Sequence, residues 1–148
     1  MPAPRKDSCW FAVMDSRSCR IFENTGNDFE PVLKLVETLK AEAVDQASDT
    51  PGSRSDTAQG QRSAMEEPDL KEQARIHFAR QIAERLDVMA QNGTIRRLVI
   101  AAAPAMLGHI RDLRSGRLAG IIEAELNLDL GHADVQRLNA ALSDSLKG

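Results

Sequence analysis

Short apolar runs alternate with polar turns along the first forty residues. Residues 9–14 (CWFAVM) form a continuous apolar run, which is typical of a strand covered on both faces. A second run covers residues 19–23 after the turn-forming residues 15–18, and a third covers residues 32–39. Because the connections between the runs are short, the pattern predicts an antiparallel meander of three strands.

Helical and strand patterns alternate in the second half. Apolar residues recur every three or four positions from Leu70 to Met89, which predicts one helix of about six turns, ended by Asn92-Gly93. The later predicted segments are a strand at 98–103, a helix from Pro104 with Met106, Leu107, Ile110 and Leu113 inward, a strand at 118–126, a loop at 127–134 and a helix at 135–146. This order predicts parallel βαβ units beside the meander. We therefore expect a layered α/β fold with a mixed sheet packed with helices.

The segment 45–69 is unusually long and polar. Between Val44 and Leu70, the residues that could be buried are only Ala47, Ala58, Ala64 and Met65. Connections in compact domains usually have about 4–6 residues. A chain of 148 residues fits one hydrophobic core. We interpret residues 1–148 as a single domain with a long polar loop at 45–69.

Composition and net charge narrow the functional classes. The apolar content of 42% is ordinary, and four Phe and one Trp are the only aromatic residues, so the core is mainly aliphatic. A net charge of −3 gives no general attraction to nucleic acid or anionic membranes, so such binding needs a local basic patch. The apolar run before Asp15 is too short for a signal peptide or a spanning helix. We expect a cytoplasmic protein without membrane insertion.

Local charge is uneven. Residues 96–117 contain five arginines and one aspartate, a local charge of +4. Arg111 and Arg114 are three residues apart on the predicted outer face of one helix and could form a surface for phosphates. Alternatively, the two arginines belong to a solvated helix face, or the arginines pair with Glu123, Glu125 and the acidic residues of the loop. The segment 45–69 has two arginines and six acidic residues, a charge of −4, which disfavours simple electrostatic binding of RNA there.

Residues with catalytic or metal-binding chemistry are scattered. Cys9 and Cys19 lack a C-x-x-C pattern, so we interpret them as small buried hydrophobes, with a reactive pair across a hairpin as the alternative. His77, His109 and His132 are 32 and 23 residues apart without other ligands at zinc spacing, so we expect neither a metal nor another cofactor. No phosphate-binding glycine motif, nucleophile elbow or converging set of titratable residues is recognisable, which makes a small-molecule enzyme the weakest hypothesis.

A series of short motifs follows the order found in one protein family. The motifs are Pro51-Gly52, Arg62, Glu67-Pro68-Asp69, Phe78-Ala79, Ala103-Pro104, Leu107-Gly108, Arg111, Glu125-Leu126 and Asp129-Leu130. Together they resemble the bacterial host-attachment protein family, described as required for attachment to host cells. The resemblance covers nearly the whole chain. Ala105 stands where the family usually has a second proline, and Ser63 where it often has histidine.

The same family is similar in architecture to the middle domain of archaeal and eukaryotic class-1 translation release factors. There a Gly-Gly-Gln loop before a long helix enters the peptidyl-transferase centre and positions water on the peptidyl-tRNA ester. In this sequence Gln59-Gly60-Gln61-Arg62, here named the tetrad, lies at the corresponding place. Gln61 matches the glutamine, and Gln59 replaces the first glycine.

The resemblance implies a release-factor-like module that binds RNA or a ribosomal or translation complex through the loop at 50–67. The binding residues of this hypothesis are Arg54, Gln59, Gly60, Arg62, Arg111 and Arg114. A first alternative is a non-catalytic protein-interaction module that acts indirectly when the bacterium attaches to host cells. A second alternative is a peptidyl-tRNA-type esterase with Gln61 as the catalytic residue.

Overall fold

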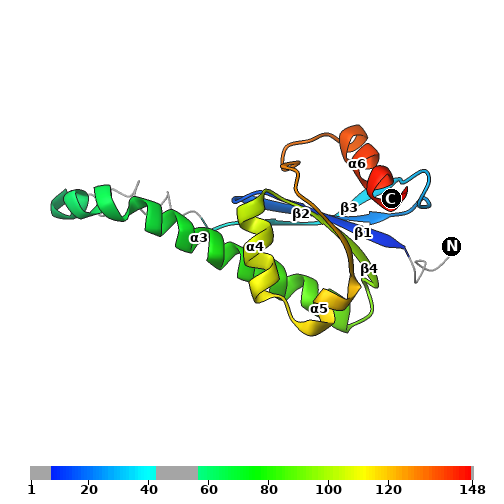
Figure 1. Ribbon diagram of the computed structural model, residues 1–148, viewed down its shortest axis with the longest axis horizontal. Helices are drawn as coiled ribbons and strands as arrows, with labels where there is room; N and C mark the ends of the chain where they lie inside the picture. Colours follow the sequence, from blue (N-terminus) through cyan, green and yellow to red (C-terminus); the bar gives the residue numbers. More distant parts are fainter. Residues whose placement is uncertain (1–7, 43–56, 148) are drawn as a thin grey trace.

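The computed structural model describes residues 8–42 and 57–147, and for residues 57–68 it describes the backbone alone. Within these ranges, five strands form a sheet in the order β3-β2-β1-β4-β5 (Figure 1). The strands are β1 (Cys9–Met14), β2 (Ser18–Asn24), β3 (Leu33–Lys40), β4 (Arg97–Ala101) and β5 (Ile122–Leu126). β1, β2 and β3 pair antiparallel in succession, whereas β4 pairs parallel with β1 and β5. The predicted meander and mixed sheet are confirmed.

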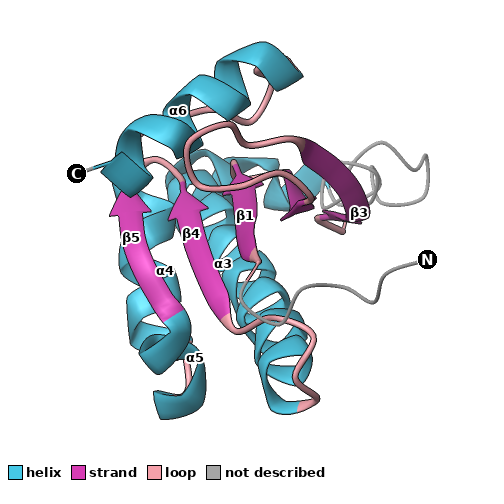
Figure 2. Cartoon of the chain, turned by 90° about the vertical axis from the view of Figure 1, so that its right-hand side faces the viewer, coloured by secondary structure: helices cyan, strands magenta, loops and turns pink. Residues whose placement is uncertain are grey.

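Helices cover both faces of the sheet (Figure 2). The helices on one face are α3 (Thr57–Gln91), α4 (Pro104–Leu113) and α5 (Gly116–Ile121), and α6 (Val135–Lys147) covers the other. The central strand β1 is buried along its whole length because its side chains alternate between the two layers. Trp10, Ala12 and Met14 join the core cluster under α3, and residues 9, 11 and 13 join the cluster under α6.

Helix α4 agrees with its prediction. Pro104 lies in its first turn, where the missing N–H leaves no hydrogen bond unmade. Met106, Leu107 and Ile110 are buried, and Leu113 packs partly buried against the same cluster as α3. Four apolar side chains at helical spacing thus fix α4 beside α3.

The start of α3 differs from its prediction. The helix begins at Thr57, thirteen residues before Leu70, so residues 57–69 are helical and the prediction that they form a loop was wrong. Of the first twelve residues of the helix, TAQGQRSAMEEP, eight are Ala, Gln, Arg, Met or Glu, which favour helix intrinsically even without an apolar stripe, whereas Gly60 and Pro68 disfavour it. Hydrophobic periodicity reveals only those turns that cover a core. Figure 1 shows the amino-terminal turns of α3 extending beyond the sheet.

The predicted strand at 118–126 is half helix. Residues up to Ile121 belong to α5, and only the last five residues form β5. Ser115 caps α5, because its Oγ accepts a hydrogen bond from the N–H of Leu118 at 3.0 Å. Leu118 is fully buried in the cluster under α3. A short apolar run is compatible with either a helix or a strand. Here the cap formed by Ser115 favours the helix.

Both cysteines are buried and free. Cys19 pairs with Met14 in the sheet, at the far end of β1 from Cys9, and the two thiols lie in different core clusters. Burial raises the pKa of each thiol to about 12. The interpretation of both residues as buried hydrophobes is confirmed, and the alternative of a reactive pair is wrong because the strand register separates them.

One ion pair attaches the edge strand β3 to α3. Arg85 donates from Nε and Nη2 to the two carboxylate oxygens of Glu37, at 2.7 and 2.8 Å. The hydrogen bonds from Arg85 lower the pKa of Glu37. Because the folded pKa is the lower one, this stabilisation is present above the unfolded value of about 4.3 and is lost as the pH falls through the folded value.

Replacing Glu37 by glutamine should lower the free energy of unfolding by about 0.5–1 kcal/mol at neutral pH, because the bidentate pair is partly exposed. The difference from wild type should shrink as the pH is lowered to about 2.5. Urea denaturation across this pH range measures it. Glu84→Gln on the exposed side of α3 is the matched control and should change little. A Glu37→Gln deficit that persists unchanged in acid would contradict the assignment.

Candidate functional site

The predicted tetrad lies on the amino-terminal part of α3. Gln59, Gly60, Gln61 and Arg62 have helical backbone, whereas Arg54 lies outside the described residues. Residues 69–71 are exposed, and the first fully buried side chain of the described part of α3 is Phe78. The amino-terminal turns therefore project from the domain, as Figure 1 shows.

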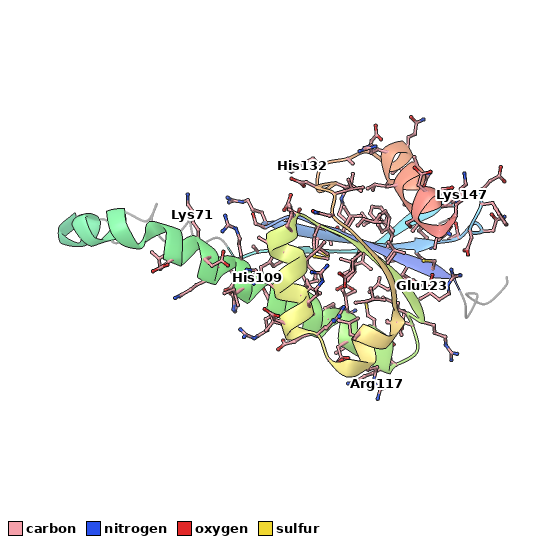
Figure 3. All side chains as sticks on the ribbon, in the orientation of Figure 1. Lys71, His109, Arg117, Glu123, His132 and Lys147 are labelled. Atoms are coloured by element: carbon pink, nitrogen blue, oxygen red, sulfur yellow. The ribbon has the colours of Figure 1, made fainter. Side chains whose placement is uncertain are left out.

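Ionic contacts surround the place where α3 leaves the domain. Glu72 Oε1 lies 3.0 Å from Arg75 Nη1, and Glu72 Oε2 lies 2.7 Å from Nε2 of His109 on α4. Arg75 and His109 together hold the pKa of Glu72 below its usual value. His77 Nε2 lies 3.3 Å from Oε1 of Glu42, which follows β3. Figure 3 shows His109 and Lys71 in this region. The contacts of Glu72 with His109 and of His77 with Glu42 join α3 to α4 and to the residues after β3.

Arg111 and Arg114 share one carboxylate. Arg111 Nε and Nη2 lie 2.7 and 2.6 Å from Glu125 Oε1, and Arg114 Nη1 lies 2.8 Å from Oε2. The arginine side chains are 54% and 26% exposed, and that of Glu125 is 20% exposed. Glu123, two residues earlier on β5, pairs with Arg97 instead. The alternative that β5 carboxylates pair with the arginines is therefore confirmed.

The arginine pair and the tetrad are separate. Arg62 precedes Glu72, the residue that meets α4, by ten helical residues, or about 15 Å along the axis. Arg111 and Arg114 face β5 at the edge of the sheet instead. The structure therefore does not bring these predicted residues into one continuous site. A partner that contacts both must span the distance between them.

A third cluster escaped the sequence analysis. Arg20 on β2 donates from Nη2 to the backbone carbonyls of Leu130, Gly131 and Ala133, at 3.0–3.1 Å. Asp15, at the end of β1, approaches the same loop so closely that a Cβ on Gly131 would lie 2.4 Å from its Oδ2. A charged residue on a strand and carbonyls 110 or more residues away share no sequence signal. Within the sequence, only the turn-forming residues 15–18 marked the position of Asp15 in this cluster.

The loop at 127–134 borders a shallow hollow. The residues that line the hollow are Asp129, Leu130, His132, Ala133, Asp134 and Arg137. His132 is 93% exposed, and its Nε2 lies 3.5 Å from Asp15 Oδ2. Asp15 Oδ1 accepts hydrogen bonds from the N–H groups of Arg17 and Ser18, at 2.8 Å each, so its carboxylate is already engaged in a turn. The polar groups here hold the loop on the sheet.

The described residues form neither a metal-binding cluster nor a membrane-spanning helix. Among the described residues, no three histidine, cysteine or acidic side chains lie close enough together to hold a metal ion. Within the same ranges, no helix combines the length and apolar character needed to cross a membrane. The charged and polar side chains of these clusters can make ion pairs and hydrogen bonds with a partner.

A mixed five-stranded sheet with a long projecting helix defines a release-factor-like α/β domain. It is similar to the "crystal structure of archaeal translation termination factor, aRF1", with a TM-score of 0.54 and 13% identity over 96% of this chain. It is also similar to a structure titled "Archaeal protein", with a TM-score of 0.52 and 13% identity over 97% of this chain. This chain spans 37% of each of those chains, and at such identity the likeness concerns the fold alone.

The family of the chain follows from its sequence. The profile of the family "Protein required for attachment to host cells" matches residues 10–142. The chain belongs to this family. No curated protein matches the chain significantly. Both parts of the expected resemblance, to the host-attachment family and to the release-factor fold, are confirmed.

Proposed function

We propose that this protein acts in the cytoplasm as a release-factor-like module that binds RNA or a ribosomal complex. The contacts would be made by residues 50–67, which include the tetrad, and by Arg111 and Arg114. The observation that carries the proposal is the projecting half of α3 on a fold that is similar to a translation termination factor. A helix end that extends past its own domain can enter a partner.

The way in which α3 packs against the core supports this role. Its carboxyl-terminal half is anchored by Phe78, Ile82 and Leu86, all essentially without solvent exposure. The ionic contacts of Glu72 then hold the helix where it leaves the core. A helix of 35 residues is about 52 Å long, so the tetrad can reach groups that the sheet cannot approach.

The charge of the chain supports recognition at discrete points. The net charge is −3, so contact with RNA depends on local cations. Arg111 keeps 54% of its side chain exposed although it is paired with Glu125. Arginine is well suited to phosphate because its planar guanidinium donates two parallel hydrogen bonds. The arginine pair would therefore contact phosphates while the tetrad contacts a more distant part of the same partner.

Co-sedimentation with purified ribosomes, with and without nuclease, tests the proposal. We expect the double variant Arg111→Gln/Arg114→Gln to bind more weakly and to lower the slope of log affinity against log salt by about 1.4, because two phosphate contacts are lost. Arg96→Gln, an exposed arginine nearby, is the matched control. An unchanged salt slope would remove the arginine pair from the interface. Nuclease-resistant capture of protein partners alone would favour the protein-interaction alternative.

The same material tests the esterase alternative. If a preparation hydrolyses peptidyl-tRNA, Gln61→Ala should abolish the activity while ribosome binding persists. Gln59→Ala is the comparison, because Gln59 stands where the Gly-Gly-Gln loop of the release factors has its first glycine. Hydrolysis that is unchanged in Gln61→Ala would dismiss that mechanism and leave recognition as the role of the tetrad.

A further inference from the structure

The arginine pair has a carboxylate built into it. Glu125 accepts hydrogen bonds from Arg111 and from Arg114, so both of its oxygens are used. Each guanidinium carries five N–H donors, and Glu125 engages fewer than half of the ten. Among the described residues, neither arginine has another charged partner. Donors therefore remain for an external anion, beside a negative charge that opposes it.

Burial places Glu125 behind the arginines. Its side chain is 20% exposed, against 54% for Arg111. Glu125 lies on the strand β5, whereas the arginines lie on the last turn and the cap of α4. Arg111 is thus the member of the group most open to an anion from solvent, whereas Arg114, at 26%, is nearly as covered as the carboxylate. Two guanidinium charges and one carboxylate leave a net charge of +1 at this position.

We propose that Glu125 is an internal competitor that sets the affinity of the arginine pair for phosphate groups. This inference rests on the proposed function, because it concerns the same arginines. A phosphate can bind the arginines while Glu125 stays in place, which brings two anions close together. Alternatively, the phosphate can displace Glu125 from the arginines. Displacement leaves a half-buried carboxylate without its partners, which is unfavourable. Either way, Glu125 weakens the binding of a single phosphate and favours ligands that present several.

The test compares Glu125→Gln with Glu123→Gln. Both variants raise the net charge by one on β5, but Glu123 pairs with Arg97 and not with the arginine pair. Figure 3 shows Glu123 on this strand. The probe is inorganic phosphate, followed through the arginine Nε–Hε resonances. We expect Glu125→Gln to bind phosphate about two- to fivefold more tightly, the size of one exposed charge interaction, and Glu123→Gln to remain near wild type.

Each outcome decides the inference. Equal gains in the two variants would reduce the effect to net charge, and weaker binding by Glu125→Gln would make Glu125 a residue that positions the arginines; either result overturns the proposal. Should Glu125→Gln not fold, Glu125→Asp retracts the carboxylate by one methylene and should show a smaller gain of the same sign. If Glu125→Asp does not bind phosphate more tightly than wild type, the inference is overturned.

A ribosome-binding assay separates this inference from the proposed function. If neither wild type nor Glu125→Gln binds ribosomes while the phosphate difference persists, the function falls and the competitor role of Glu125 stands. If ribosome binding is confirmed and the phosphate difference is absent, the proposed function stands and the competitor role of Glu125 falls. Emission from the buried Trp10 reports whether each variant is folded.

Discussion

Replacing Phe78 by alanine should lower the free energy of unfolding by about 3–5 kcal/mol, the usual cost of removing a fully buried aromatic ring. Phe78 is 1% exposed and packs in the cluster shared by α3, α4 and the sheet. It is also the first fully buried side chain of the described part of α3, so its ring anchors the helix where the projecting turns begin. Because small domains are stable by about 5–15 kcal/mol, the variant should lose a large share of its stability.

Urea denaturation followed by Trp10 emission measures this loss. Val88→Ala is the matched control on the same helix, because its side chain is 46% exposed and its truncation should cost less than about 1 kcal/mol. Similar losses for Phe78→Ala and Val88→Ala would mean that α3 is not anchored at Phe78. Ribosome binding by the remaining folded protein would show whether the anchor also matters for the partner.

Replacing Arg20 by methionine should cost about 2–4 kcal/mol, because buried carbonyl groups would lose a charged donor. Arg20 Nη2 binds the carbonyls of Leu130, Gly131 and Ala133 together. Its guanidinium also lies 5.5 Å from the centre of the Phe22 ring, which adds a cation–π contact. Methionine preserves most of the apolar length of the side chain, so the change removes the hydrogen bonds and the cation–π contact while most of the packing remains.

Hydrogen exchange locates the effect of this substitution. Amides of the loop at 127–134 and the first turn of α6 should exchange faster in Arg20→Met, whereas those of α3 should change little. Arg96→Met, an exposed arginine on the same chain, is the control and should leave both the stability and the loop unchanged. A uniform increase over the whole protein would indicate general destabilisation and not a role of Arg20 in fixing the loop.

Much of the fold could be predicted because burial leaves a clear mark on sequence. β1 is apolar throughout and β4 is apolar after Arg97, since helices cover both strands on both faces. The stripe from Leu70 to Met89 marks the part of α3 that packs on the sheet, although Leu70 itself is 48% exposed and full burial begins at Phe78. The polar turns before it carry no such stripe, so the sequence predicts a loop there. The run from Leu118 to Ile122 was ambiguous because a single helical turn and a buried strand have similar composition.

The candidate site was less predictable because it depends on contacts between distant residues. The pairing of the arginines with a β5 carboxylate was foreseen as an alternative from charge alone, but only the parallel alignment of β4 and β5 places Glu125 under α4. The contacts of Arg20 and of Asp15 with the loop at 127–134 link the first strands to residues near the carboxyl end of the chain. No local pattern encodes such contacts.

The position of β1 in the sheet also shapes how the chain is made. This strand pairs on one side with β2, which follows at once, and on the other with β4, whose first residue is Arg97. During synthesis the meander can form early. The other edge of the apolar β1 stays unpaired until β4 is made, and more than 80 residues separate the end of β1 at Met14 from Arg97. At typical translation rates this takes on the order of ten seconds. Nascent chains of intermediate length therefore expose a strand edge that chaperones could bind, and closure of the β1–β4 pair should be the late step of folding.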